Sequence, residues 1–197
     1  MKKPILCPLV TLLICAVVLL AISAALNGMA TERAAQSRLE LLSTLLPGGE
    51  GFSEEAYTGE DANIRSVYKA ENGCVIETCT YGYAGDVTML IGVANSGKVT
   101  GLMVLEAHET PGLGNNALTD TDFLAQFLNK TGEFTVSTGS ADAFSGATGT
   151  VDAENALEVD AITGATVTSK AIARSVTSAC GYVTGADVVS SATSWGG

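Results

Sequence analysis

An uncharged apolar stretch near the N-terminus constrains this chain most. Residues Pro4 to Leu26 read PILCPLVTLLICAVVLLAISAAL, which is 23 residues without a charged side chain. A helix of about 20 apolar residues spans the hydrocarbon core of a bilayer, so the stretch is long enough to cross a membrane. Lys2 and Lys3 precede it, and positive charge on that side favours a cytoplasmic N-terminus. The sequence therefore predicts a single-pass anchor with the rest of the chain outside the cytoplasm.

A cleaved signal peptide is the competing interpretation of the same stretch. Ser23-Ala24-Ala25 resembles a small-residue cleavage site. The apolar region is, however, longer than the about 7–15 residues usual in a signal peptide, so the retained anchor is preferred. Neither Cys7 nor Cys15 follows the small residues of a lipoprotein processing site, which argues against a lipid anchor.

The remainder of the chain is strongly acidic. The sequence has 10 Lys and Arg against 21 Asp and Glu, a net charge of −11; without Lys2 and Lys3, 8 basic residues remain and the net charge is −13. No basic stripe can neutralise phosphates, which excludes nucleic-acid binding. One histidine and no Cys-x-x-Cys pair argue against a metal site. An oxidising compartment would permit a disulfide between Cys74 and Cys79, but residues five apart on a strand point to opposite faces. Cys74, Cys79 and Cys180 are therefore expected to be free thiols.

The pattern after the anchor predicts one α+β domain. Residues 31–46 have leucines at helical spacing and end at Pro47-Gly48, which indicates a connecting helix. Four strand-like runs follow, and turn residues between them favour antiparallel pairing. These runs are Ile64–Ala70, Gly73–Thr80, Asp86–Val93 and Lys98–Leu105. We expect a twisted, mostly antiparallel sheet with helices packed against it.

The elements divide the chain into four parts. They are a cytoplasmic N-terminus with the transmembrane anchor (1–27), a connecting helix (28–49), the folded domain (50–183) and a C-terminal tail (184–197). Within the domain, a short helix is expected over Thr121–Leu128, with Thr119 or Thr121 as its N-cap and its apolar residues, Leu128 included, directed inward. Residues 131–159 give no clear pattern.

A hydroxyl-rich turn, which we call the attachment segment, occupies residues 160–169 and reads DAITGATVTS. Gly164 can adopt a backbone conformation that other residues avoid. Thr166 stands where a helix should begin, because apolar residues recur at helical spacing beyond it. Gly181 is the expected end of that helix.

The start of this helix suits a phosphate group. A helix N-terminus offers unpaired N–H groups and a partial positive charge. Lys170 and Arg174 lie four and eight residues beyond Thr166, so one helical face carries both charges. The Thr166 hydroxyl is therefore placed to hold a phosphate or to be esterified by one. The alternative is that Thr163 or Thr166 merely caps the helix, and the residues alone leave both interpretations open.

The attachment segment resembles a known signature. Asp160-x-x-Thr163-Gly164-Ala165-Thr166 followed by Val167-Thr168-Ser169 is similar to the flavinylation signature of FMN-binding domains. Such domains occur in the G subunit of Rnf electron-transport complexes and in the C subunit of sodium-pumping NADH:quinone oxidoreductases. In that family the last threonine of the signature carries FMN through a phosphoester bond that a dedicated flavin transferase installs. The resemblance implies covalent FMN on Thr166, with Asp160, Thr163, Gly164, Ala165 and Thr168 also binding the cofactor.

A second segment, which we call the glycine loop, occupies residues 109–114 and reads ETPGLG. A Pro-Gly turn followed by another glycine lets the backbone approach a flat ligand closely, and Leu113 can lie against an apolar ring. Such loops are commonly structural. This one resembles the segment that lines the isoalloxazine pocket in the same family. The resemblance adds to the expected FMN-binding residues Glu109, Thr110, Pro111, Gly112, Leu113 and Gly114.

Residues 142–148, DAFSGAT, give a second formal match to the flavinylation signature. Thr148 ranks below Thr166 because residues 149–152 do not continue as an amphipathic helix. A phosphate there would also lie among acidic side chains such as Asp152, which is electrostatically unfavourable. Thr148 is therefore the alternative attachment residue.

The resemblance implies a membrane-anchored flavoprotein that transfers electrons and forms no product of its own. Chain length fits the G subunit of an Rnf-type ferredoxin:NAD oxidoreductase complex, which couples electron flow to sodium or proton transport. The expected partners are the other membrane subunits and a flavin transferase. Alternatives are a stand-alone flavinylated carrier, a C-type subunit of a sodium-pumping NADH:quinone oxidoreductase, and a non-redox membrane-anchored binding module. No side chain has the pattern of a catalytic acid or base, and His108 is expected to make a structural hydrogen bond or to tune the flavin.

Overall fold

The computed structural model describes residues 36–110, 114–137 and 156–185, together with positions 18, 20 and 23. Two compact units divide the chain, Met1–Leu41 and Leu42–Gly197. Apart from those three helical positions, the predicted anchor Pro4–Leu26 lies outside the described residues. Within the described part, no helix combines the length and the apolar character needed to cross a membrane.

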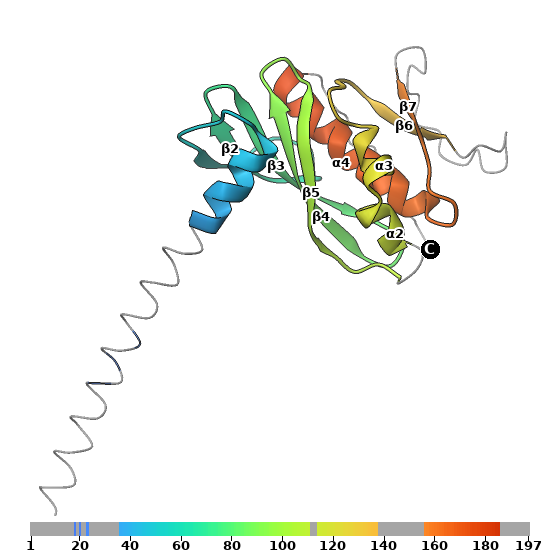
Figure 1. Ribbon diagram of the computed structural model, residues 1–197, viewed down its shortest axis with the longest axis horizontal. Coiled ribbons are helices and arrows are strands. Elements are labelled where there is room, and N and C mark those ends of the chain that lie inside the picture. Colours follow the sequence, from blue (N-terminus) through green and yellow to red (C-terminus); the bar gives the residue numbers. More distant parts are fainter. Residues whose placement is uncertain are drawn as a thin grey trace, which may run out of the picture. The chain divides into compact units, whose positions relative to one another are not determined.

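A five-stranded antiparallel sheet forms the centre of the second unit (Figure 1). The strands lie in chain order, so each pairs with its neighbour in the sequence. They are β1 (Ser53–Ala56), β2 (Ile64–Ala70), β3 (Gly73–Tyr81), β4 (Asp86–Ala94) and β5 (Val99–Ala107). The ends of β2 to β5 agree within two residues with the strands predicted from the sequence, which confirms the antiparallel meander.

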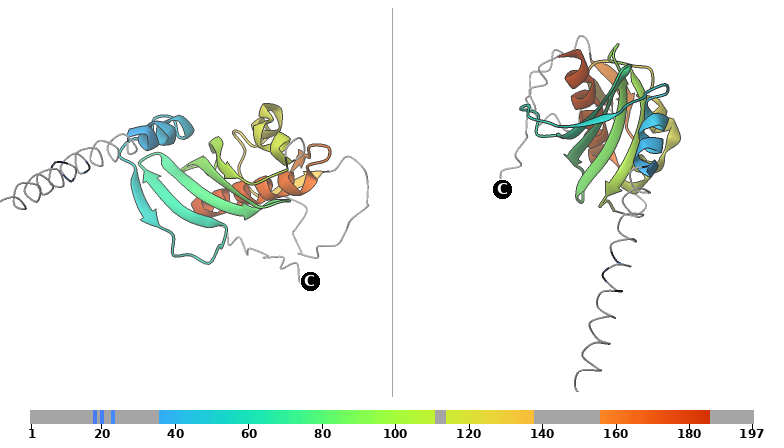
Figure 2. Two further views of the ribbon diagram at one scale, coloured as in Figure 1. Left: turned by 90° about the horizontal axis from the view of Figure 1, so that it is seen from below. Right: turned by 90° about the vertical axis from the view of Figure 1, so that its left-hand side faces the viewer.

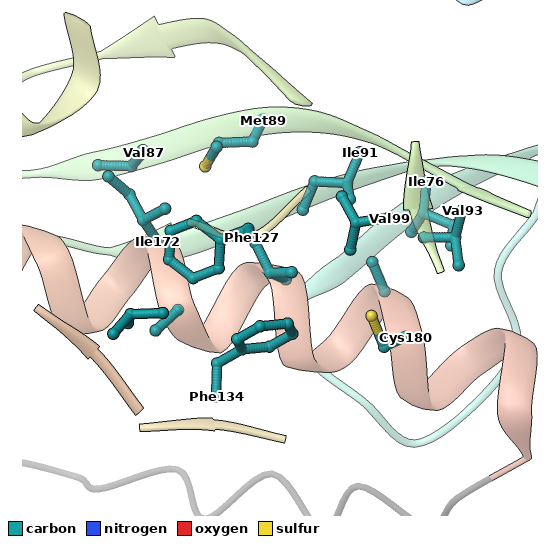
Figure 3. Packing of buried hydrophobic residues seen from close by; sticks show 14 of the residues in the cluster. Ile76, Val87, Met89, Ile91, Val93, Val99, Phe127, Phe134, Ile172 and Cys180 are labelled. Atoms are coloured by element: carbon teal, nitrogen blue, oxygen red, sulfur yellow. The ribbon is translucent and has the colours of Figure 1, made fainter. Parts of the chain in front are cut away.

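A long helix, α4 (Thr166–Thr184), covers one face of this sheet (Figure 2). Its apolar residues pack against side chains of β3 and β4, and Figure 3 shows Val87 and Met89 on the sheet side of this core with Cys180 on the helix. Thr80 Oγ1 of β3 donates to Ala171 O at 3.1 Å and accepts from Ser175 Oγ at 2.9 Å, so the two elements are also joined by hydrogen bonds. The helix predicted from Thr166 onward is confirmed.

The predicted end of this helix at Gly181 is wrong. Gly181 is buried within α4, and the C-cap is Gly185, whose φ of 67° is the left-handed conformation typical of a C-terminal glycine. Tyr182 and Val183 pack against the core, so burial extends the helix past a residue of low helix propensity.

Three leucines cover part of the opposite face of the sheet. Residues 36–45 are helical, as predicted for the connecting segment. Leu42, Leu45 and Leu46 are each at most 4 % exposed and pack against side chains of β2, β3 and β4. The backbone of Leu45 approaches β4 so closely that a side chain at Gly92 would collide with it. Glycine at this position therefore permits the close approach.

Short elements complete the domain. Two helices follow β5, and a parallel two-stranded sheet precedes α4. Of these elements the sequence predicted only the second helix. These elements are α2 (Gly114–Thr119), α3 (Thr121–Ala125), β6 (Phe134–Ser137) and β7 (Leu157–Asp160). α4 contacts β6 and α2 in addition to the large sheet (Figure 1). The last residue of β7 is thus the first residue of the attachment segment.

Two details of the predicted helix at Thr121–Leu128 are wrong. The N-cap is Asp120, whose carboxylate accepts hydrogen bonds from the N–H groups of Asp122 and Phe123; Thr119 and Thr121 do not cap it. The helix ends at Ala125, and Leu128 is 36 % exposed. An aspartate carboxylate is the stronger acceptor for these helical N–H groups, which explains the choice of cap.

Phe127 should contribute strongly to stability. Its side chain is fully buried, with ring centroids 5.4 Å from Phe123 and 5.2 Å from Phe134. We expect Phe127→Ala to lower the free energy of unfolding by about 3–5 kcal/mol, because burial is lost and a cavity is left. Urea denaturation measures the change. The neighbouring Leu128→Ala, at an exposed position, serves as the control and should cost less than about 1 kcal/mol; equal losses at the two positions would contradict this packing.

The described cysteines Cys74, Cys79 and Cys180 are free, as expected. Burial raises the pKa of Cys180 from 9.0 to about 11. The unfolded state therefore loses this proton first, so the thiol leaves the unfolding free energy unchanged below about pH 9 and lowers it as the pH rises to about 11. Between pH 9 and pH 11 the unfolding free energy, measured by urea denaturation, should fall more in the native sequence than in Cys180→Ala. The difference between the two falls should be about 2–3 kcal/mol. Equal pH dependence in the two proteins would contradict the assignment.

Candidate functional site

The attachment segment begins with a tight turn. The Ala165 N–H donates to Ile162 O at 2.9 Å, and Gly164, the third residue of the turn, has a φ of 80°. This is the geometry of a type II turn, whose third position favours glycine. The Ile162 N–H donates to Ser169 Oγ at 3.3 Å, which ties the turn to the first turn of α4. The conformational freedom predicted for Gly164 is confirmed.

Thr166 is the first residue of α4 and is half-buried. The N-cap is Ala165, which has no side-chain group to hydrogen-bond to the helix. The interpretation of Thr163 or Thr166 as the N-cap is therefore wrong. Among the described residues no side chain caps this N-terminus, so its first N–H groups are available to an anion.

Thr168 has a buried hydroxyl close to the glycine loop. Its side chain is 0 % exposed, and Oγ1 has no hydrogen-bond partner among the described residues. A Cβ built on Gly114 would lie 2.7 Å from this oxygen, so the last residue of the glycine loop touches the first turn of α4. Buried hydroxyls are nearly always hydrogen-bonded in folded proteins. This buried Oγ1 beside Gly114 therefore fits a place where a polar group of a ligand is accepted.

Glu109 of the glycine loop holds a neighbouring hairpin. Its carboxylate accepts hydrogen bonds from the N–H groups of Tyr83 at 2.7 Å and Ala84 at 3.3 Å. These residues lie in the connection between β3 and β4, and the Glu109 carboxylate also borders Gly114. Both carboxylate oxygens thus have backbone donors. No pattern in the sequence indicates that Glu109 fixes this hairpin.

Tyr83 is a further candidate residue, and no sequence motif points to it. Its ring is 66 % exposed, yet its backbone is fixed by Glu109 beside Gly114. An exposed aromatic ring whose backbone is held by the glycine loop is suited to stacking on a planar ligand. Its position depends on a contact 26 residues away in the chain, which explains why local sequence does not mark it.

The remaining residues of the glycine loop are only partly described. Thr110 is half-buried, and its carbonyl oxygen accepts from the Asn115 N–H at 3.4 Å, which closes the loop at its base. Pro111, Gly112 and Leu113 lie outside the described residues, as does the alternative attachment residue Thr148. Their predicted roles stay predictions.

Three basic residues near the site, Lys170, Arg174 and His108, have exposed side chains. Lys170 and Arg174 are both exposed on α4, and Arg174 Nε donates to Lys170 O at 3.4 Å. The His108 side chain is 71 % exposed, and its Nε2 lies 3.7 Å from Glu106 Oε1. This long, exposed contact replaces the structural hydrogen bond expected for His108.

A cavity of about 310 Å³ opens elsewhere, on the sheet face opposite α4. Thr80 faces α4, so Cys79 beside it points to the other face. Arg65 donates to Cys79 Sγ at 3.1 Å, which raises the pKa of Arg65. The other lining residues are Glu77, Asp86, Thr88, Glu106 and His108. Ligand pockets are lined mainly by apolar and aromatic side chains, so we do not assign the flavin to this charged cavity.

Metal binding has no support in the described part of the chain, where no cluster of His, Cys, Asp and Glu could hold an ion.

Within the described residues, the start of α4 combines an uncapped N-terminus, a buried hydroxyl without a hydrogen-bond partner and a glycine loop in contact with it. These features make the start of α4, in an α+β domain, suited to a phosphate group. The chain belongs to the FMN-binding domain family, which matches residues 82–181. That span contains both the glycine loop and the attachment segment.

Relatives of known name cover most of the chain. The G subunit of the proton-translocating ferredoxin:NAD(+) oxidoreductase complex of Clostridium ljungdahlii is 28% identical over 89% of this chain and 87% of its own length. The G subunit of the ion-translocating oxidoreductase complex of Methanosarcina acetivorans is 30% identical over 76% of each chain. The crystal structure of Shewanella oneidensis NqrC matches with a TM-score of 0.45 at 20% identity, covering 72% of this chain and 68% of that one. The relatives confirm the resemblance to G subunits.

Proposed function

We propose that this chain is the flavin-carrying electron-transfer subunit of a membrane-bound, ion-translocating ferredoxin:NAD oxidoreductase complex of the Rnf type. The family match supports FMN as the cofactor. The names of the relatives, together with alignments over most of both chains, support the place in the complex. The proposal includes a phosphoester bond that joins FMN to Thr166.

One observation carries the proposal for the attachment site: in the described part of the chain no side chain caps the N-terminus of α4, and Thr166 is the first residue of that helix. Thr166 is half-buried, and its hydroxyl belongs to the same first turn as the free N–H groups. A phosphate esterified to Thr166 would accept hydrogen bonds from these N–H groups. Thr168, two residues further on, projects from another side of the helix and borders the glycine loop at Gly114. The glycine loop and Tyr83 would then border the flavin ring.

Covalent attachment suits the charge of this chain. When bound, FMN supplies one- and two-electron transfer. A phosphodiester keeps one negative charge where the free phosphate monoester has nearly two, which lowers repulsion from a chain of net charge −11. Lys170 and Arg174, exposed on α4, add favourable charge near its N-terminus. The residues of this chain thus bind and orient the cofactor, and none is assigned an acid or base role.

The proposed location follows from the anchor predicted over Pro4–Leu26. A single N-terminal span with the flavin domain outside the cytoplasm would keep a tethered cofactor at the membrane. The partners would be the other membrane subunits of the complex and the flavin transferase that loads the domain.

The proposal is tested by producing the full chain in cells with and without a flavin transferase. We expect yellow protein whose flavin stays with the polypeptide after acid precipitation, and only when the transferase is present. Colourless protein, from cells whose transferase modifies another substrate normally, would favour the non-redox binding module.

A further inference from the structure

Gln126 makes an unusual pair of contacts with the first residue of the attachment segment. The Asp160 N–H donates to Gln126 Oε1 at 2.9 Å, and Gln126 Nε2 donates to Asp160 O at 3.4 Å. One carboxamide thus serves both the backbone donor and the backbone acceptor of a single residue, as a neighbouring strand would. Gln126 is half-buried at the C-cap of α3, and its partner is 34 residues away.

The other edge of Asp160 is also held. Asp160 pairs with Ser137 in the parallel ladder of β6 and β7, and the next N–H, that of Ala161, donates to Ser137 O at 2.8 Å. Gln126 itself follows α3, which is fixed to the core through Phe123 and adjoins the buried Phe127. The backbone at Asp160 is therefore bound on two sides by well-packed elements.

The chain runs from this doubly held point to the attachment residue in six steps. The type II turn at residues 162–165 and the bond from Ile162 N–H to Ser169 Oγ fix most of that path. Asp160 is exposed and is the last residue of β7. Without Gln126, the described contacts would hold the start of the attachment segment only on the side of β6. The Gln126 carboxamide is thus the contact that ties α3 to the start of the attachment segment.

We propose that Gln126 is a positioning residue for the loading of FMN, an inference that rests on the function proposed above. By holding Asp160 it presents the Thr166 hydroxyl to the flavin transferase in one conformation. In the loading step the Thr166 Oγ1–phosphorus bond forms while the phosphoanhydride bond of a flavin dinucleotide breaks. The hydroxyl proton passes to a base of the transferase, and the nucleoside monophosphate leaves. Gln126 takes no part in that chemistry; it lowers the cost of ordering the segment when the transferase binds.

The test compares two variants of the full chain as substrates of the flavin transferase. Gln126→Met keeps the length of the side chain and removes both hydrogen bonds. Asn95→Leu is the matched control, because it removes a similar bond, from Asn95 Nδ2 to Glu71 O at 2.9 Å, in the turn after β4. We expect kcat/KM for flavinylation to fall about tenfold in Gln126→Met, because the free energy of about one net hydrogen bond corresponds to about a tenfold change in rate. In Asn95→Leu it should stay within about twofold of the native value. Melting temperatures of the two variants should fall by similar small amounts.

A second readout needs no flavin. Amide hydrogen exchange of Asp160, measured by NMR on the unloaded chain, should be about tenfold faster in Gln126→Met than in the native sequence. Unchanged exchange, or loading of Gln126→Met at the native rate, would overturn the inference and leave the proposed function intact. Failure of the native chain to accept flavin from an active transferase would instead overturn both.

Discussion

A Thr166→Val chain produced together with a flavin transferase should carry no covalent FMN. Valine has nearly the shape of threonine but no hydroxyl, so the nucleophile for the phosphoester bond is gone. Thr166 is half-buried at the first position of α4 and its side chain is not the N-cap, so the fold should persist. We expect in-gel flavin fluorescence to fall at least about a hundredfold, because the variant lacks the oxygen atom that forms the bond to the flavin phosphate.

The matched control for this prediction lies at the other end of the same helix. Thr184→Val removes a hydroxyl that donates to Cys180 O at 2.9 Å, and it should leave the fluorescence unchanged. Fluorescence retained in Thr166→Val would move the attachment site elsewhere. Thr148→Val in the same background would then show whether the second signature match carries the flavin.

A Gly114→Ala chain should lose most of its capacity for flavin while remaining folded. A Cβ at this position would lie 2.7 Å from Thr168 Oγ1 and 2.9 Å from the Glu109 carboxyl carbon. Both neighbours are fixed, the first by burial in α4 and the second by its hydrogen bonds to the hairpin. α2 and α4 must therefore separate, at a cost of about 1–3 kcal/mol in unfolding free energy. We expect flavinylation to slow at least about tenfold, because the two segments of the site no longer meet.

Two further variants separate this collision from a general effect on α2. Asn115→Ala changes the next, exposed residue of the same helix and should alter neither stability nor flavinylation appreciably. Thr168→Ala, combined with Gly114→Ala, removes the atom that the new methyl group meets, so the double variant should be more stable than the sum of the single losses predicts. Additive losses in this cycle would mean that Gly114 and Thr168 are not in contact.

Much of this architecture is predictable because it rests on local patterns. The strands β2 to β5 alternate or run apolar between clear turn residues such as Asn72-Gly73, and their bounds follow. The start of α4 is equally clear, since Gly164 requires a turn and Thr166 begins the helical spacing. The approach of the glycine loop to the attachment segment follows only from the family resemblance, and the contact between Gly114 and Thr168 supplies its geometry.

The contacts that depend on distant residues were not predictable. Nothing near Glu109 indicates that its carboxylate reaches Tyr83, and nothing near Gln126 indicates a bond to Asp160. The parallel pairing of β6 with β7 joins segments with 19 residues between them, and each strand has only four residues. Short strands of this kind carry too little periodicity to be recognised from sequence alone.

The errors at element ends have a common cause in tertiary packing. Gly181 has the low helix propensity of any glycine, yet burial of the residues around it keeps α4 intact as far as Thr184. Leu128 is apolar and in register with the expected helix, yet that helix ends at Ala125 and leaves it partly exposed. Packing thus decides where these helices end.

Peptide mass spectrometry tests most directly whether the Thr166 hydroxyl carries FMN. The native full-length chain, isolated from cells that contain a flavin transferase, is digested and its peptides are fragmented. We expect the peptide containing Thr166 to be heavier by the mass of FMN less one water, with the added mass on that threonine. An unmodified Thr166 peptide, whether the flavin is on Thr148 or on no residue at all, would contradict the assignment.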